Sequence, residues 1–390
     1  MTDRLVPLAV PPGAGVAEVV PALRLALDGD GPALAPHAAE EVPPDLPAGA
    51  DLPAGLALAV GTSGSTGRPK RALLTAAALR ASAAATHERL GGHGQWLLAM
   101  PAHHIAGLQV LVRSLLADRS PVVLDRTAHF TPGAFSAATD RLERGGRRYT
   151  ALVPTQLARL LADETGRRAL LRYDGVLAGG AATPGRLLEG AVDAGVRVLT
   201  TYGMSETAGG CFYDGRPLAG ARVRFDDAGR VSLGGPMVAH GYLGEPELTA
   251  AAFTTDPDGT RWFRTDDLGH LDEHGVLRVE GRVDDVINTG GLKVAPRSVE
   301  EALTRQLPHV LEAVVVGTPD PEWGEAVSAA VVCPGGRAVT VDELRAALRG
   351  ILPDHALPRR VATWEAIPQR GPGKPDRRAV RERSVWQDWT

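Results

Sequence analysis

The stretch Gly61-Thr-Ser-Gly-Ser-Thr-Gly-Arg-Pro-Lys70 decides how the rest of this sequence is interpreted. Residues 56–60 before it form an apolar run that predicts a strand, and residues 71–86 after it predict an Ala- and Leu-rich helix. The polar stretch is therefore expected to be a loop. Its glycines permit sharp turns, its hydroxyl groups can donate hydrogen bonds, and Lys70 adds positive charge, which together suit a polyphosphate.

Two other interpretations of this loop fit less well. A flexible Gly/Ser turn would explain Gly-Ser-Thr-Gly but not the appended Arg-Pro-Lys. A Walker A loop would end in Gly-Lys-Ser/Thr, and this loop does not, which argues against a P-loop NTPase.

Strands and helices alternate along the chain around this loop. Strands are predicted at residues 95–100, 121–124, 175–177 and 197–200, and helices at 16–27, 107–116, 156–161 and 184–194. Residues 28–51, rich in Pro, Ala, Gly and acidic residues, predict an irregular connection. The alternation predicts a mainly parallel sheet with helices on both faces, followed beyond Ser205 by short strands and Gly-rich turns.

A smaller unit is predicted beyond Arg282. Its expected elements are helices at 296–306 and 341–352, the second with a capping box of Thr340 and Glu343, and strands at 310–317, 326–333 and 360–364. The predicted fold class is α/β. Residues 1–282 are predicted to form a large N-terminal domain with mainly parallel sheets flanked by helices plus a small β-rich part. Residues 283–390 are predicted to form a small α+β C-terminal domain, and the family resemblance given below implies that it is mobile.

Composition excludes several classes of protein. The 42 basic and 46 acidic residues give a net charge of −4, which argues against a nucleic-acid-binding surface. No apolar stretch approaches the roughly 18 residues of a membrane span, and the two cysteines are too far apart for a disulfide framework or a cysteine metal site. We expect a cytoplasmic protein without a membrane span.

The basic residues include only three lysines, Lys70, Lys293 and Lys374, beside 39 arginines. A coding bias towards arginine would leave these lysines at random positions. Alternatively, the three could not be replaced, and the sequence leaves both explanations open.

Two further motifs carry groups suited to a nucleotide. Thr201-Tyr-Gly-Met-Ser-Glu-Thr207 follows a predicted strand at the carboxyl edge of the sheet, where ligands collect in open α/β folds. In it, Glu206 can hold a divalent cation, Thr207 can donate to a phosphate, and Tyr202 offers a face to a flat ring. In Trp262-Phe-Arg-Thr-Asp-Asp267, the last carboxylate can accept both hydroxyls of a ribose.

Two more motifs are Gly281-Arg-Val-Asp-Asp285 with Asn288-Thr-Gly-Gly-Leu-Lys293, and Pro368-Gln-Arg-Gly-Pro-Gly-Lys374. Taken in order from about Leu56 to Lys374, all these motifs resemble the adenylate-forming superfamily of acyl- and aryl-CoA ligases, luciferases and nonribosomal adenylation domains. The resemblance implies ATP, Mg²⁺ and CoA as cofactor, metal and co-substrate.

The resemblance also implies site residues. It assigns the phosphates of ATP to Thr62, Ser63, Gly64, Ser65, Thr66, Gly67 and Lys70. It assigns the adenine and acyl pocket to Gly179, Gly180, Ala181, Tyr202 and Gly203. It assigns the ribose to Asp267 and Arg282. Glu206 contacts Mg²⁺, Thr207 contacts the α-phosphate, and Lys374 is the catalytic lysine of adenylation. Asp284 is the hinge, and Gly290 and Gly291 let the pantetheine arm of CoA pass close to the backbone.

Lysine suits the adenylation step. A carboxylate and the α-phosphate of ATP are both anionic, so positive charge aimed at the transferring group lowers the barrier. The compact ammonium of Lys374 can reach both anions, whereas a guanidinium fork imposes its own planar geometry.

One segment bears on which acid is bound. Pro101-Ala-His-His-Ile-Ala-Gly-Leu resembles a segment at the acyl pocket of many acyl-CoA ligases, with His104 in the motif position. Without that context a solvated or capping histidine is the simpler interpretation. Arg113 follows within an apolar helix, where an unpaired charge is costly. It lies on the outer face, bridges to Asp118 or Asp125, or binds a second carboxylate of the substrate.

The chain has little more than 50 residues before the phosphate loop and contains the pattern His-Ile-Ala-Gly-x5-Arg. In both respects it resembles the abbreviated actinobacterial o-succinylbenzoate–CoA ligases of menaquinone biosynthesis. Their substrate carries an aromatic carboxylate besides the one that is activated. The alternatives are another aryl- or acyl-CoA ligase, an enzyme that passes the acyl group to an amine or carrier protein, and a non-catalytic nucleotide-binding protein. The sequence departs from the superfamily at Asp266, usually Gly, and at Pro375. A homodimer stays open.

Overall fold

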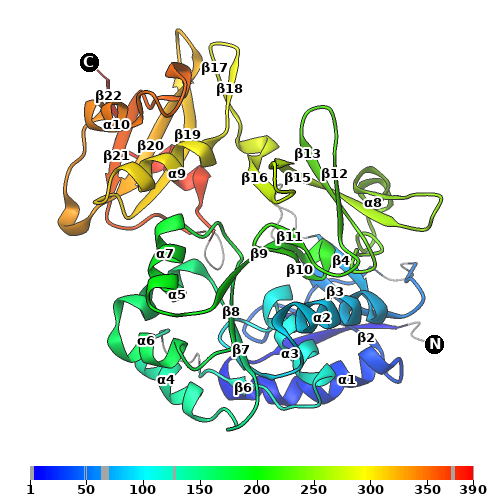
Figure 1. Ribbon diagram of the computed structural model, residues 1–390. Coiled ribbons are helices and arrows are strands. Elements are labelled where there is room, and N and C mark those ends of the chain that lie inside the picture. The colour runs from blue at the N-terminus through cyan, green and yellow to red at the C-terminus, as the bar shows by residue number, and fades with distance from the viewer. Residues whose placement is uncertain are drawn as a thin grey trace. The chain divides into compact units, whose positions relative to one another are not determined.

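The computed structural model describes residues 4–47, 49, 51–62, 70–125, 129–369 and 374–389 (Figure 1). By internal contacts the chain divides into two compact units. The first unit comprises residues 1–183, 190–224 and 232–265, and the second comprises residues 184–189, 225–231 and 266–390. The main division between the units falls at Asp266, before the boundary predicted after Arg282. The hinge at Asp284 stays a prediction.

Two sheets form the framework of the first unit. The four-stranded sheet has the order β1 (Leu5–Val10), β2 (Ala33–Ala38), β3 (Leu56–Gly61) and β4 (Arg71–Thr75). The seven-stranded sheet has the order β11 (Arg216–Pro217), β10 (Gly209–Tyr213), β9 (Val198–Met204), β8 (Gly175–Ala178), β7 (Arg148–Leu152), β5 (Gln95–Leu98) and β6 (Val122–Val123). The strands from β9 to β6 are parallel, which confirms the predicted mainly parallel α/β arrangement.

Helices cover both faces of the seven-stranded sheet. Those described before residue 200 are α1 (Val20–Asp28), α2 (Ala76–Leu90), α3 (Ile105–Leu116), α4 (Pro132–Asp140), α5 (Pro154–Ala162), α6 (Glu164–Leu170) and α7 (Gly185–Asp193). Helix α2 contacts β3 and β4 as well as β10, so it lies between the two sheets, next to α3 (Figure 1). Helices α4, α5 and α6 pack together on the other side of the seven-stranded sheet.

The predicted helix over residues 71–86 is wrong in its first five residues, which form β4. Strand β4 pairs antiparallel with β3, and Ala72, Leu73 and Leu74 are buried there as a continuous apolar run. Such a run fits either a buried strand or a buried helix, and tertiary pairing decides. Helix α2 begins only after Thr75, whose Oγ1 accepts a hydrogen bond from Ala78 N at 3.1 Å.

The predicted irregular connection over residues 28–51 is wrong as well, because it contains β2, all six residues of which are buried. This strand pairs parallel with β1, which the sequence analysis did not predict. Strands buried on both faces lack the alternation of polar and apolar residues that marks a half-exposed strand. Helix α4, strand β7 and helix α6 were not predicted from the sequence either.

A third sheet has the order β12 (Arg222–Phe225), β13 (Arg230–Gly234), β15 (Arg261–Leu271) and β14 (Phe253–Thr255), with β16 (Leu277–Arg282) paired to β15. Helix α8 (Pro246–Ala252) precedes β14. Short 3₁₀ turns are described at η1 (Gly13–Val19), η2 (Ser205–Thr207), η3 (Val283–Asp285), η4 (Pro334–Gly336) and η5 (Asp354–Ala356).

The last sheet belongs to the second unit. It contains β17 (Ile287–Thr289), β18 (Leu292–Val294), β19 (Glu312–Asp320), β20 (Gly324–Val332), β21 (Arg360–Trp364) and β22 (Gln387–Asp388). Helices α9 (Pro296–Gln306), α10 (Val341–Leu348) and α11 (Arg377–Arg383) complete the predicted α+β unit. Val299, Leu303 and Leu344 pack on Val315 and Val327 in its core.

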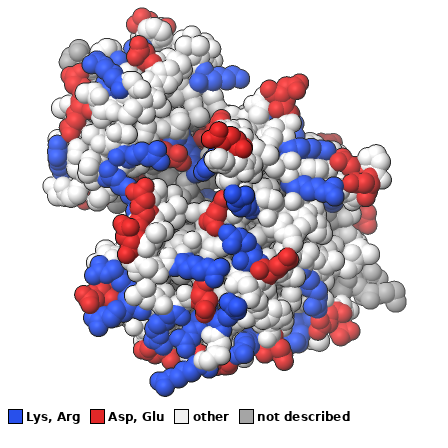
Figure 2. Space-filling view, in the orientation of Figure 1, with Lys and Arg blue, Asp and Glu red and all other residues white. Residues whose placement is uncertain are grey.

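The surface is mixed in charge. Figure 2 shows basic and acidic side chains interspersed on the face that it presents, in keeping with the net charge of −4. Within the described residues, no helix combines the length and the apolar character needed to cross a membrane.

Candidate functional site

Several sequence motifs follow the carboxyl ends of parallel strands in the first unit. Strands β5, β8 and β9 run parallel in the seven-stranded sheet, so the segments that follow them leave the same edge. These segments carry His104, Gly179 to Ala181, and Glu206 with Thr207. This edge is where ligands bind in open α/β sheets.

The acidic turn η2 is attached to the start of the phosphate loop. Ser205 Oγ donates a hydrogen bond to the carbonyl oxygen of Gly61, the last residue of β3, at 3.1 Å. Glu206 is 8% exposed, and Thr207 is fully buried. Thr207 Oγ1 accepts from Met204 N at 3.0 Å and donates to the Gly209 carbonyl oxygen at 2.8 Å, so this hydroxyl already stabilises the turn.

The phosphate loop is closed at its base. Thr62 N donates to the Lys70 carbonyl oxygen at 2.8 Å, which brings the two ends of the loop together. The predicted contacts Ser63, Gly64, Ser65, Thr66 and Gly67 lie outside the described residues.

Tyr242 contacts both sides of this site and is not among the residues predicted from the sequence. Its hydroxyl donates a hydrogen bond to Glu206 Oε1 at 2.9 Å, and Lys70 Nζ lies 5.3 Å from the centroid of its ring. A lone tyrosine among short strands gives no pattern that predicts such a role. Only the fold brings it to Glu206.

The glycine-rich segments have steric reasons for their composition. A β-carbon on Gly179 would lie 2.2 Å from Thr201 Oγ1, and one on Gly203 would lie 2.2 Å from the Gly209 carbonyl oxygen. Side chains are thus excluded there. Gly180 and Ala181 continue the loop after β8, and Tyr202 is half-buried in β9.

His104 occupies the N-cap position of α3, but its side chain makes no capping hydrogen bond. The capping interpretation of this histidine therefore fails. The ring is exposed, and its centroid lies 4.2 Å from that of His103.

Arg113 is buried, with 3% of its surface exposed, so the prediction that it lies on an outer face is wrong. Its Nη2 donates to Tyr213 Oη at 3.4 Å, and its guanidinium carbon lies 5.0 Å from the centroid of the Trp96 ring. Its Nε has no hydrogen-bond partner among the described residues. Burial lowers the pKa of Arg113, and Tyr213 raises it in part.

The structure does not bring Arg113 to the start of α3. Nine residues separate it from His104, which corresponds to about 13 Å along a helix. Its neighbour Trp96 lies near the beginning of β5, whereas His104 follows the end of that strand. An acid that contacts both residues must extend along α3.

The predicted ribose residues are paired in the second unit. Asp267 and Arg282 face each other across β15 and β16, with Arg282 Nη1 4.0 Å from Asp267 Oδ1. Arg282 Nη2 donates to Asp266 Oδ2 at 3.2 Å and lies 4.0 Å from Asp284 Oδ2.

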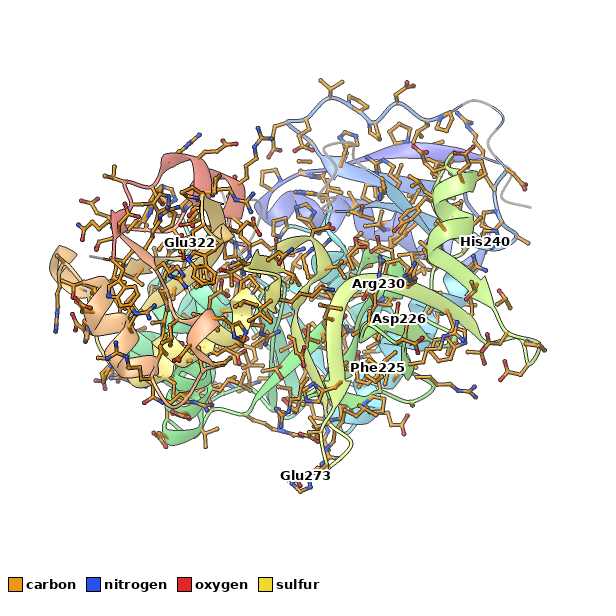
Figure 3. The ribbon with its side chains drawn as sticks, turned by 90° about the horizontal axis from the view of Figure 1, so that it is seen from above. Phe225, Asp226, Arg230, His240, Glu273 and Glu322 are labelled. Atoms are coloured by element: carbon orange, nitrogen blue, oxygen red, sulfur yellow. The ribbon has the colours of Figure 1, made fainter. Side chains whose placement is uncertain are left out.

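Asp266, one of the departures from the superfamily pattern, thus has a structural role. Its carboxylate also accepts a hydrogen bond from Arg230, which follows Asp226 in the β12–β13 turn (Figure 3). Asp226 Oδ1 in turn accepts from Arg230 N at 2.9 Å. Asp266 therefore holds Arg282 against a second arginine.

Gly290 and Gly291 form the two-residue turn between β17 and β18, with φ values of +59° and +79°. Two positive φ values in a two-residue hairpin turn require glycine or asparagine. Gly290 N also donates to the Trp323 carbonyl oxygen at 2.8 Å. The hairpin turn is therefore sufficient to explain why positions 290 and 291 are glycines.

Lys374 and Lys293 are both exposed in the second unit. Lys374 precedes α11, whose N-cap is Asp376, and Asp376 N donates to the Pro368 carbonyl oxygen at 2.7 Å.

The donor set of the first unit fits a magnesium ion bound together with a nucleotide. Among the described residues, no group of three or more His, Cys, Asp or Glu side chains could hold a metal alone. Mg²⁺ is commonly held by one or two carboxylates together with substrate phosphates and water. Glu206, beside the base of the phosphate loop, is such a carboxylate.

Comparison with known proteins gives consistent results. The AMP-binding enzyme family matches residues 15–243, and the AMP-binding enzyme C-terminal domain matches residues 298–374. A probable 2-succinylbenzoate–CoA ligase of Mycobacterium tuberculosis is 45% identical over 96% of this chain and 97% of its own length. A 2-succinylbenzoate–CoA ligase of Listeria monocytogenes is 32% identical over 83% of this chain and 69% of its own.

Solved structures show the same fold. The o-succinylbenzoate CoA synthetase of Bacillus subtilis in complex with its acyl-adenylate intermediate superposes with a TM-score of 0.76 at 23% identity, over 98% of this chain and 88% of that one. The amide bond synthetase McbA of Marinactinospora thermotolerans gives a TM-score of 0.76 at 29% identity, over 96% of this chain and 79% of that one.

Proposed function

Because this chain belongs to the AMP-binding enzyme family, we propose that it is an AMP-forming acid–thiol ligase that converts 2-succinylbenzoate into its CoA thioester. In the first step a carboxylate oxygen of the acid attacks the α-phosphorus of ATP, and pyrophosphate leaves. In the second step the CoA sulfur attacks the acyl carbon of the adenylate, and AMP leaves. The product supports menaquinone biosynthesis.

One observation carries the adenylation proposal. The acidic turn with Glu206 is hydrogen-bonded through Ser205 to the end of β3, where the phosphate loop begins. A carboxylate for a cation and a polar loop for phosphates are thus held together by the fold of the first unit. The nucleotide-binding groups that the superfamily resemblance implied are consistent with this arrangement.

We assign the following roles within this reaction. Glu206 holds Mg²⁺, which neutralises phosphate charge when it is bound. Lys70 and the loop backbone bind the β- and γ-phosphates, and Lys374 provides positive charge to the carboxylate and the α-phosphate during adenylation. We propose that Asp267 accepts the ribose hydroxyls and that Arg282, which donates a hydrogen bond to Asp266, contacts the same sugar.

We propose that Arg113, buried beside Trp96 and Tyr213, is the partner of a second carboxylate on the acid. A buried guanidinium without a carboxylate is costly, and among the described residues no carboxylate pairs with Arg113. The aromatic carboxylate of 2-succinylbenzoate supplies that partner if the acid extends along α3 from His104.

The test is a set of reactions with ATP, Mg²⁺ and CoA in which the acid is varied. We expect pyrophosphate and a CoA thioester with 2-succinylbenzoate, and much lower rates with benzoate and with short fatty acids. Turnover of the simple acids together with inactivity towards 2-succinylbenzoate would refute the substrate. Absence of pyrophosphate release with any acid would refute the reaction.

A second candidate is favoured by the similarity to an amide bond synthetase. In that case an amine rather than CoA would consume the adenylate. Following the adenylate with CoA alone, with an amine alone and with both separates the two acceptors. A cytoplasmic location and a homodimer stay predictions.

A further inference from the structure

We propose that Tyr242 is a positioning residue for nucleotide binding, which acts on the Glu206 carboxylate through its hydroxyl and on the Lys70 ammonium through its ring. This inference rests on the proposed function, because it assigns a role towards ATP and Mg²⁺. Neither the family resemblance nor the sequence pattern assigned a role to this residue.

The first support is the pair of contacts that Tyr242 makes. A phenol that donates to a carboxylate forms a charge-assisted hydrogen bond, which fixes the orientation of that carboxylate. A lysine ammonium within about 6 Å of an aromatic centroid is attracted to the ring face. The same side chain thus restrains a group for the cation and a group for the phosphates.

The second support is the way in which Tyr242 itself is held. Its backbone follows β4 like an added strand, because His240 N donates to the Leu73 carbonyl oxygen at 2.9 Å and Leu73 N to that of Gly241 at 2.8 Å. Leu243 N donates to the Arg71 carbonyl oxygen at 2.9 Å, directly after Lys70.

The segment is also joined to the acidic turn and packed on its other side. Ala239 N donates to the carbonyl oxygen of Glu206 at 2.8 Å. The ring of Tyr242 packs edge-on against Phe253, with 5.2 Å between the centroids, and the residue is only 8% exposed. Tyr242 is therefore held firmly in place beside the Glu206 carboxylate and the Lys70 ammonium.

The chemical consequence is specific. Removing only the hydroxyl takes one hydrogen bond from the Glu206 carboxylate and should weaken the part of ATP binding that depends on Mg²⁺. Removing the ring as well releases Lys70 and should weaken ATP binding even without the metal. Contacts with the acid should not change.

The experiment measures ATP binding by calorimetry with Mg²⁺ and with EDTA for Tyr242→Phe, Tyr242→Leu, Glu206→Gln and the Tyr242→Phe/Glu206→Gln double variant. Tyr173→Phe is the matched control, because its hydroxyl lies 2.8 Å from Thr139 Oγ1 within a separate buried pair. For Tyr242→Phe we expect about tenfold weaker binding with Mg²⁺ and unchanged binding with EDTA, the size expected for one charge-assisted hydrogen bond. The double variant should bind no worse than Glu206→Gln, because the hydroxyl acts through that carboxylate.

Several results would overturn the proposal. The first is that Tyr242→Phe binds ATP with Mg²⁺ as tightly as the wild type does. The second is that Tyr242→Phe weakens ATP binding equally with Mg²⁺ and with EDTA. The third is that Tyr242→Phe melts far below Tyr173→Phe, which would mean that Tyr242 is needed for folding. Failure of the proposed function would be a separate result. If the wild-type protein binds ATP but activates no acid, the differences in ATP binding between the variants can still be measured.

Discussion

The indole N–H of Trp96 donates a hydrogen bond to Nε2 of His87 at 3.2 Å, inside the first unit where His87 is only 2% exposed. Burial, together with the smaller effects of the nearby His93 and Arg113, lowers the pKa of His87 to about 4. The imidazole is therefore neutral in the folded protein at neutral pH.

This histidine should make folding sensitive to acid. Because the pKa of His87 is lower in the folded state than its ordinary value of about 6.5, protonation favours the unfolded chain. Its contribution is complete above pH 6.5 and is lost as the pH falls towards 4. Between pH 7.5 and 5 we expect a loss of about 2 kcal/mol in the free energy of unfolding. Denaturant titrations of wild type and His87→Gln at both pH values measure it, and equal pH dependence in the two proteins would contradict the expectation.

Lys374→Ala should reduce pyrophosphate release with 2-succinylbenzoate by about a hundredfold or more, the effect expected when positioned charge is lost from a transition state. Lys374→Arg should be nearly as slow, because the planar fork cannot reproduce a point charge. Thioester formation from a synthetic acyl-adenylate should persist in both. The exposed Lys293→Ala serves as the control, and normal adenylation by Lys374→Ala would remove this lysine from the mechanism.

Arg113→Ala should raise the KM for 2-succinylbenzoate by about tenfold or more while leaving the KM for ATP within twofold, because a charge-assisted contact to the acid is lost. Arg113→Lys should recover only part of the difference, since its ammonium cannot pair in a bidentate manner. Steady-state kinetics with each substrate varied in turn give both constants. Equal increases in the two would assign Arg113 to packing against Trp96 and Tyr213.

Gly290→Ala should destabilise the second unit more than Gly291→Ala. Both positions have positive φ, which costs a residue with a side chain about 1–2 kcal/mol. A β-carbon at Gly290 would also lie 2.6 Å from the Trp323 ring, whereas at Gly291 it meets nothing within 4 Å. Thermal unfolding of the two variants compares them directly, and a larger effect at Gly291 would show that the clash with Trp323 is relieved without cost.

Much of the fold could be predicted from local patterns. The α/β class and the strands and helices around the phosphate loop followed from apolar periodicity and from Gly-rich turns. Strands β2 and β4 could not be predicted in this way, because they are buried on both faces and their sequences show no alternation. Strand β2 also pairs with β1, which was not predicted, and the apolar run of β4 fits a buried helix as well as a strand until its pairing with β3 is known.

The sequence proposes site residues where chemistry is concentrated in short motifs. Glu206 and Asp267 stand out within such motifs, whereas Arg282 was assigned only by the superfamily resemblance, and the roles of all three stay predictions. No short motif indicated Tyr242 or Asp266, because their contacts with Glu206 and Lys70 and with Arg230 and Arg282 arise only in the folded chain. A structural departure such as Asp266 is understood only once its two arginine partners are known.

The hydrogen bonds between the Tyr242 segment and β4 have a consequence for how the protein matures. Residues 71–73 and 240–243 are far apart in the chain, so their pairing closes a large loop and belongs to the slower, non-local part of folding. A growing polypeptide that has made the phosphate loop still lacks the residue that restrains Lys70 and Glu206. On our proposal, nucleotide affinity therefore increases when this pairing closes, and ATP stabilises the folded protein by mass action rather than its precursors.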